Sequence, residues 1–223
     1  MRHRGSTSGE VRDDARSEGE AGTTGAARYG LLALVAAVTS AGIWLLMIVD
    51  EDRNIGAATL EMAIKFTNLT VVLVGVIAAW IAFGRSPGRA RPIAHLTVIV
   101  MVVVTALVNA TLLDPGLPSG WWGLVDLFQH YLIPVAVVVL WGTQGPPVDV
   151  PRADLPWTIA VPFAWLVVVL TRGSWTDRYP YDFLDPSESG RGTVLATVIA
   201  LTASMLVLAL GLSSLDRWRG NRH

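Results

Sequence analysis

The sequence predicts an all-α membrane protein, a bundle of six transmembrane helices with both termini in the cytoplasm. Hydrophobic residues make up 52% of the 223 residues, and the mean hydropathy is +0.49, which is too apolar for an ordinary soluble domain. Charged residues make up only 16% of the chain and stand almost wholly between long apolar runs. The membrane is therefore the solvent in which this chain is expected to fold.

Residues 1–28 are rich in Gly, Ser, Thr, Glu, Asp and Arg and have almost no large apolar side chain. Such a segment cannot bury enough apolar surface to offset the entropy of ordering the chain. We therefore predict a disordered cytoplasmic tail over 1–28 and a short cytoplasmic tail over 216–223. The first apolar run, 29–49, is too long and too far from the N-terminus for a cleaved signal peptide, so we expect it to be retained.

Six apolar runs within residues 29–215 approach the length that a helix needs to cross about 30 Å of hydrocarbon. Turn-forming and charged residues separate the runs. Pro134 and Pro162 lie inside runs, where neighbouring helices can satisfy the freed carbonyl groups, so they predict kinks rather than helix ends. The predicted spans are 29–49, 62–83, 92–113, 123–142, 156–172 and 192–213.

Lys and Arg residues are unevenly divided between the two sides of this topology. Twelve of the 17 fall on the side of the termini, and positive side chains mark the cytoplasmic side of a membrane protein. Both termini are therefore predicted to be cytoplasmic, in a multi-pass protein of the cell membrane. Seven of the nine Trp residues fall near predicted span ends, as an interfacial aromatic belt requires.

Composition excludes or disfavours several kinds of site and partner. Cysteine is absent, which excludes a disulfide framework, a thiolate zinc site and a cysteine nucleophile. The net charge of −1, without a basic patch interleaved with aromatic residues, gives no reason to expect a nucleic-acid partner. Haem or quinone chemistry is disfavoured because His95 and His130 belong to opposite leaflets. We expect no cofactor and no metal ion, and the expected partners are the lipid bilayer and a lipid-like substrate.

Three polar residues are expected to meet near the outer boundary of the membrane. Thr67 in the second span and His130 in the fourth lie on helices that both run inward from the outer face, at a depth of roughly 8–10 Å for a rise of about 1.5 Å per residue. Asp126 precedes His130 by four residues, so it shares a helical face and can accept the imidazole N–H. This pattern suggests a hydroxyl nucleophile, a base and a group that orients the base.

Each of these residues also has a purely structural interpretation. A threonine in a helix commonly donates its hydroxyl to its own backbone one turn earlier, and that is the default for Thr70 and Thr105 as well as for Thr67. An intramembrane histidine is usually functional, but His130 could instead join two helices by a hydrogen bond. The sequence does not identify an oxyanion hole. Asn68 is a candidate for that role, and for substrate binding, only because it is adjacent to Thr67.

The connection between the fifth and sixth spans is the other informative segment. It faces outward and combines two tyrosines, two carboxylates and two prolines, which suit a rigid lid at the level of the lipid headgroups. An interfacial turn with no chemistry explains the same composition. Asn109 and Asp114, at the outer end of the third span, could extend the polar cluster. The substrate-binding candidates in the connection are Tyr179, Tyr181, Asp182 and Asp185.

Three segments together resemble the signatures of a known membrane family. They are 66–70 (FTNLT), 130–134 (HYLIP) and 179–186 (YPYDFLDP), in that order, on the second span, the fourth span and the last outer connection. They resemble the bacterial branch of the family related to the androgen-induced, FAR-type proteins of animals, and the resemblance covers about residues 30–213. Animal members are multi-span threonine hydrolases that cleave fatty acid esters of hydroxy fatty acids with a Thr and a His. The resemblance implies these roles for Thr67 and His130.

Two classes of function therefore follow from the sequence. The first is a membrane-embedded hydrolase of an apolar, fatty-acyl ester, with Thr67 as nucleophile, His130 as base and Asp126 as orienting group. The second is a multi-span membrane protein without catalysis, such as a small transporter, a lipid-binding protein or a scaffold, that uses the same polar cavity. Transporters typically have paired broken helices or an internal repeat, and the sequence shows neither feature.

Overall fold

The computed structural model describes residues 7–84, 90–113, 119–146, 148 and 150–220. These residues form helices and no strand, which confirms the predicted all-α class. Six of the helical segments are long and apolar enough to cross a membrane, so the chain is a multi-pass integral membrane protein. The six segments are Ala27–Val49, Phe66–Phe83, Ala90–Thr111, Gly120–Thr143, Arg152–Thr176 and Arg191–Arg219.

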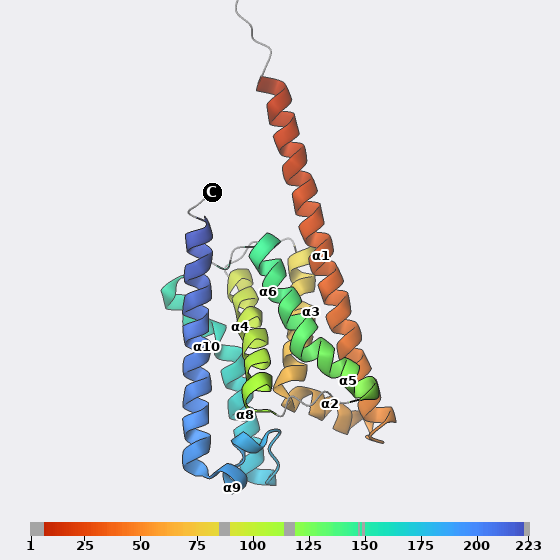
Figure 1. Ribbon diagram of the computed structural model, residues 1–223, viewed down its shortest axis with the longest axis vertical. Helices are drawn as coiled ribbons and strands as arrows, with labels where there is room; N and C mark the ends of the chain where they lie inside the picture. The colour runs from red at the N-terminus through yellow and green to blue at the C-terminus, as the bar shows by residue number, and fades with distance from the viewer. Residues whose placement is uncertain (1–6, 85–89, 114–118, 147, 149, 221–223) are drawn as a thin grey trace, which may run out of the picture.

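An even number of spans brings the two ends of the chain to the same side of the bundle. Figure 1 shows the N-terminal half of α1 (Thr7–Val49) and the end of α10 (Arg191–Gly220) at one end, with α2 (Ile55–Ile64) and α9 (Pro186–Ser189) at the other. We call the second end the distal end. That the distal end faces outward remains the prediction made from the Lys and Arg residues.

Helix α1 begins at Thr7 and so reaches through most of the segment predicted to be disordered. Its membrane-crossing part begins at Ala27, two residues before the predicted start. The segment is rich in Gly, Ser, Thr and Asp, which are poor helix formers, so its composition gives no local reason for a helix. The helix nevertheless continues through 7–28, and this part projects beyond the bundle in Figure 1.

The predicted span 62–83 is divided in the structure, and the membrane-crossing helix α3 starts at Phe66 (Phe66–Phe83). Lys65 is extended, with φ −82° and ψ 118°, and separates α3 from α2. Two side chains satisfy the main-chain groups that the break exposes: Trp165 Nε1 donates to the Ile64 carbonyl at 3.1 Å, and the Phe66 N–H donates to Tyr181 Oη at 3.1 Å. Because these partners are about 100 residues away along the chain, local periodicity could not show the break.

The fourth span changes from an α-helix to a π-helical turn around His130 and then returns to an α-helix. Helix α5 (Gly120–Leu127) leads into the π-helical turn η1 (Phe128–Leu132) and then into α6 (Ile133–Gln144). Pro134 has no N–H to give to the carbonyl of His130, four residues before it. The chain instead widens by one residue, and the N–H of Ile133 bonds to the Phe128 carbonyl. The disturbance expected at Pro134 thus appears as a π-turn that contains His130.

The fifth span consists of two short turns and a longer helix: η2 (Arg152–Asp154), α7 (Leu155–Thr158) and α8 (Ala160–Thr176). The distal connection, residues 177–190, follows α8. Asp177, in the left-handed conformation, ends α8. The connection then forms the single turn η3 (Asp182–Leu184) and the short helix α9 before α10 begins.

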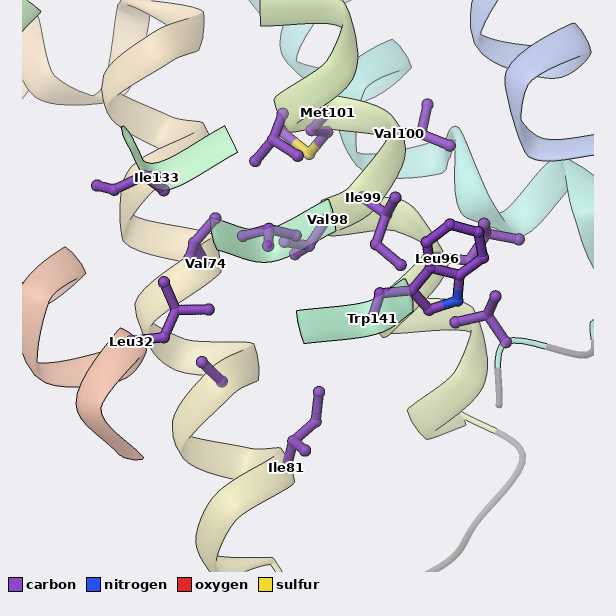
Figure 2. Packing of buried hydrophobic residues seen from close by; sticks show 14 of the residues in the cluster. Leu32, Val74, Ile81, Leu96, Val98, Ile99, Val100, Met101, Ile133 and Trp141 are labelled. Carbon is purple, nitrogen blue, oxygen red and sulfur yellow. The ribbon is translucent and has the colours of Figure 1, made fainter. Parts of the chain in front are cut away.

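Helix α4 (Ala90–Thr111) is the centre of the bundle and the most buried of the six spans. Its side chains form a continuous hydrophobic core with those of α1, α3 and α6. Figure 2 shows part of this core, where labelled side chains include Ile99 of α4, Val74 of α3 and Trp141 of α6. The core holds α3 beside η1 and α6 and so fixes the relative position of the second and fourth spans.

The distal connection is held against α8 by a close aromatic contact at Gly173. A β-carbon at this glycine would lie 2.1 Å from Cε1 of Tyr179. We expect Gly173→Ala to displace the tyrosine ring and to lower the stability of the folded protein by about 1–3 kcal/mol, the usual effect of overpacking. The measurement is the thermal unfolding midpoint in detergent. Gly211→Ala is the matched control because nothing lies within 4 Å of its added carbon, and an unchanged midpoint in Gly173→Ala would contradict the close packing.

Candidate functional site

A polar cavity of about 570 Å³ opens at the distal end between α1, α3, α5, η1 and the distal connection. Its walls combine apolar side chains with several charged and hydrogen-bonding groups. The lining residues are Ile43, Met47, Glu51, Lys65, Thr67, Asn68, Leu113, Trp122, Val125, Asp126, Gln129, His130, Pro180 and Tyr181.

Thr67, His130 and Asp126 form a connected chain of polar groups on the wall of this cavity. Thr67 Oγ1 lies 3.4 Å from Nε2 of His130, and His130 Nδ1 lies 2.7 Å from Oδ1 of Asp126. The histidine and aspartate side chains are 11% and 22% exposed, so both are partly shielded from water yet open to the cavity. A base that takes the proton from the threonine hydroxyl would thus be held by a carboxylate on its other nitrogen.

Two interruptions of regular α-helix position Thr67 and His130: the start of α3 at Phe66 and the π-turn η1. Because α3 begins at Phe66, Thr67 lies in its first turn, where main-chain N–H groups lack partners inside the helix. The positive end of the helix dipole is therefore next to the threonine hydroxyl. His130 lies in the middle of η1, and single π-turns inside helices are frequent at functional sites.

Tyr181 of the distal connection lies next to Thr67. Its hydroxyl oxygen accepts the Phe66 N–H at 3.1 Å and also interacts with the Thr67 side chain. Its ring packs on Phe183 and near Trp165. Burial raises the pKa of the Tyr181 hydroxyl, and hydrogen bonds with Thr67 and Phe66 oppose this shift only in part. The tyrosine thus stays protonated and can donate a hydrogen bond beside Thr67.

Asn68 and Gln129 form a buried pair behind the threonine and the histidine. Gln129 Nε2 donates to Asn68 Oδ1 at 2.7 Å, and the pair joins α3 to η1. The sequence does not show that Gln129 bonds to Asn68; its position next to His130 is the only indication that it belongs to the site. Glu51 and Trp122 also line the cavity and were not predicted from the sequence, and Lys65 lines it as well. Lys65 pairs with Glu61 at 3.3 Å.

Four sequence-predicted residues that the structure describes do not line the polar cavity: Asn109, Tyr179, Asp182 and Asp185. Asn109 is buried on α4 and lines neither this cavity nor the apolar pocket described next. Tyr179 packs against Gly173, and Asp182 belongs to η3. Asp185 caps α9, because its carboxylate accepts from the N–H and the hydroxyl of Ser187. Asp114 lies outside the described residues. Of the four candidates in the distal connection, the structure brings only Tyr181 to Thr67.

A second, apolar pocket lies on the other side of Thr67 and Tyr181. It has a volume of about 40 Å³ and lies among α3, α4, α8, α10 and η3. Its lining includes Val104 of α4 and Leu201 and Met205 of α10. Thr67 and Tyr181 line both the polar cavity and this pocket. Thr67 therefore stands at the boundary between the polar cavity and the apolar pocket.

Within the described part of the chain, no cluster of three or more His, Asp or Glu side chains could hold a metal ion. His95 is at the opposite end of the bundle from His130, where its Nε2 lies 3.2 Å from Tyr29 Oη. Among the groups described, the Thr67–His130–Asp126 chain is the arrangement with the clearest chemical capability. Comparison with family models, with curated proteins and with solved structures found no match for this chain.

Proposed function

We propose that this integral membrane protein is a hydrolase of apolar, fatty-acyl esters, with Thr67 as nucleophile and His130 as general base. The observation that carries the proposal is the continuous contact from the Thr67 hydroxyl through the His130 ring to the Asp126 carboxylate, at 3.4 Å and 2.7 Å. The first distance is long for a hydrogen bond, but catalytic contacts often tighten only when substrate binds. The resemblance of segments 66–70, 130–134 and 179–186 to the FAR-type threonine hydrolases supports the same roles.

In the acylation step His130 Nε2 takes the hydroxyl proton of Thr67 as Oγ1 bonds to the ester carbonyl carbon. Asp126 orients the imidazole through Nδ1 and stabilises its positive charge. The tetrahedral intermediate collapses when the bond between carbonyl carbon and leaving oxygen breaks. His130 then gives its proton to that oxygen, which leaves as an alcohol, and the acyl group stays on Thr67.

In the deacylation step water enters from the polar cavity. His130 takes a proton from this water, and the water oxygen bonds to the acyl carbon. The bond between that carbon and Oγ1 breaks, Thr67 recovers its proton from His130, and a carboxylic acid is released. The cavity volume of about 570 Å³ is ample for water, of which each molecule occupies about 30 Å³ in the liquid.

The two spaces that meet at Thr67 fit the two parts of such an ester. The apolar pocket towards Met205 suits the start of an acyl chain, and the polar cavity beside Lys65 suits the leaving group and water. Entry from the outer leaflet would follow if the distal end faces outward as predicted. A transporter, a lipid-binding protein or a scaffold would use the cavity without breaking a bond.

A direct comparison of turnover with uptake separates the two classes of function. Purified protein in lipid vesicles is incubated with p-nitrophenyl esters of increasing chain length, and p-nitrophenol release is measured beside uptake of a labelled solute. Hydrolysis with saturation kinetics is the expected result. Solute uptake or lipid binding with no ester turnover above that of empty vesicles would favour the alternative and contradict the proposal.

Asp126→Asn is expected to lower kcat by about 10²–10⁴-fold, because an amide at this position no longer favours the tautomer of His130 that accepts a proton at Nε2. The shape of the side chain is kept, so KM and the thermal unfolding midpoint should change little. Asp177→Asn is the matched control, since Asp177 ends α8 in a left-handed conformation that asparagine tolerates. Equal activity of the two variants would remove Asp126 from the mechanism.

A further inference from the structure

Another space, which no step of the mechanism uses, lies between α8 and α10. It has a volume of about 30 Å³, and we call it the α8–α10 pocket. Two of its lining side chains carry a polar group, and both groups are engaged. Thr202 Oγ1 donates to the Val198 carbonyl at 2.8 Å, and Trp165 Nε1 donates to a main-chain carbonyl at 3.1 Å. The pocket is therefore suited to apolar groups rather than to water. Its lining residues are Ile159, Pro162, Phe163, Trp165, Leu166, Leu201, Thr202 and Met205.

Three side chains line both this pocket and the apolar pocket described above: Trp165, Leu201 and Met205. They form the wall that the two spaces share. Trp165 is held in place by its hydrogen bond and by its ring contact with Phe66, at 4.9 Å between ring centroids. Met205 is unbranched and has three rotatable bonds, so its side chain adapts to what it packs against. The wall is therefore fixed on the α8 side and adaptable on the α10 side.

The two pockets follow one another along the axis of the bundle. On α8 the apolar pocket reaches only Trp165, whereas the α8–α10 pocket extends from Trp165 back to Ile159. Six residues correspond to about 9 Å at the rise of an α-helix. Because α8 ends at the distal connection, Ile159 lies farther from the distal end than Trp165. Phe163 of this pocket is exposed, and so borders the surface that faces lipid. The series of pockets therefore leads from Thr67 into the membrane, the direction in which lipid acyl chains lie.

We propose that the two pockets together bind the acyl chain of the ester, with Leu201 and Met205 setting the length of chain that is accepted, an inference that rests on the proposed hydrolase function. The apolar pocket, at about 40 Å³, holds about three groups of the size of water, which need about 10–15 Å³ each. Only the first carbons of an acyl chain fit there when the carbonyl carbon is at Thr67 Oγ1. A longer chain displaces Met205 and continues into the α8–α10 pocket. The substrate class is thus an ester of an unbranched fatty acid.

The first test changes the α8–α10 pocket without changing the apolar pocket. Thr202 lines only the former, so Thr202→Phe fills it. We expect the ratio of kcat/KM for p-nitrophenyl palmitate to that for p-nitrophenyl acetate to fall by about tenfold or more. Met205→Ala widens the shared wall and should raise the same ratio by about threefold or more. Ala203→Phe is the matched control, because Ala203 is exposed and lines neither pocket.

A ratio is used because a general loss of folded protein lowers both rates equally and leaves the ratio unchanged. Opposite changes in Thr202→Phe and Met205→Ala, with no change in Ala203→Phe, would support the inference. An unchanged ratio in both pocket variants, or an equal fall in Thr202→Phe and Ala203→Phe, would overturn it. Where Thr202→Phe does not fold, Met205→Ala decides between these results.

The second test does not depend on turnover. Wild-type protein in lipid vesicles is irradiated with a palmitic acid analogue that carries a diazirine at the end of its chain, and the labelled peptides are identified by mass spectrometry. Labels that excess palmitic acid displaces are expected on the residues of α8 and α10 that line the α8–α10 pocket. They should persist in Ala203→Phe and disappear in Thr202→Phe. Displaceable labels confined to other helices, or none at all, would overturn the inference.

The two tests together separate failure of this inference from failure of the proposed function. If wild type hydrolyses esters and neither pocket variant alters the ratio, the hydrolase stands and the acyl-chain assignment fails. If wild type hydrolyses no ester, the proposed function fails. A displaceable label in the α8–α10 pocket would then still support binding of an acyl chain there, and its absence would overturn that as well.

Discussion

Replacing Thr67 by alanine is expected to lower kcat for ester hydrolysis by about 10⁴-fold or more, the scale seen when the nucleophile of a catalytic unit is removed. The alanine variant lacks the oxygen that bonds to the carbonyl carbon, so no acyl-enzyme can form. Residual turnover would come only from water oriented by His130 and by the donors around the site. The rates are measured on purified protein in detergent or lipid vesicles with the p-nitrophenyl esters described above.

Two variants control for structural effects of this change. Thr67→Ser keeps a hydroxyl at the same position and is expected to retain measurable turnover. Thr70→Ala removes a hydroxyl one turn further along α3 that donates to the Phe66 carbonyl at 2.8 Å, so it should stay within a few-fold of wild type. A Thr67→Ala variant as active as Thr70→Ala would show that the hydroxyl of Thr67 takes no part in the reaction.

Replacing His130 by alanine is the second large effect that we expect, with a fall in kcat of about 10⁴-fold or more. Without Nε2, at 3.4 Å from Thr67 Oγ1, nothing else among the described contacts of that hydroxyl is a base. The threonine would remain a neutral alcohol, which is a weak nucleophile. The same ester assay measures the loss.

The double variant Thr67→Ala/His130→Ala tests whether the two residues act as one unit. Groups that act together in one step are strongly non-additive, so the double variant should be about as slow as either single variant. If the losses instead multiply, the residues contribute independently. That result would contradict proton transfer from the threonine to the histidine.

The class of the fold could be predicted from the sequence because membrane-crossing helices need long apolar runs, and apolar content is a local property. The starts of helices were less predictable. Lys65 is the one charged residue of segment 62–83, but a single charge does not show where a helix ends. The separation of α2 from α3 depends on Trp165 and Tyr181, which satisfy main-chain groups from distant parts of the chain. Such partners leave no periodic signal in the segment that they interrupt.

Helix spacing and the common direction of the two spans suggested that Thr67, His130 and Asp126 could meet, and the structure brings their side chains together. The equal depth that supported this expectation was counted from helix starts that differ in the structure, because α3 begins at Phe66 and α5 at Gly120. Whether these residues are catalytic remains a prediction. The π-turn at His130 and the pair of Asn68 with Gln129 could not be predicted, because both depend on how η1 packs against α3. Tyr181 was a candidate from composition, whereas its contact with Phe66 required the folded chain.

The site of covalent modification shows directly whether Thr67 is the nucleophile. Wild-type protein is incubated with a fluorophosphonate that carries an alkyl chain, digested, and analysed by mass spectrometry for the modified peptide. We expect one stoichiometric adduct on Thr67, formed much more slowly in His130→Ala and absent in Thr67→Ala. An adduct on another residue, or equal labelling of Thr67→Ala, would contradict Thr67 as the nucleophile.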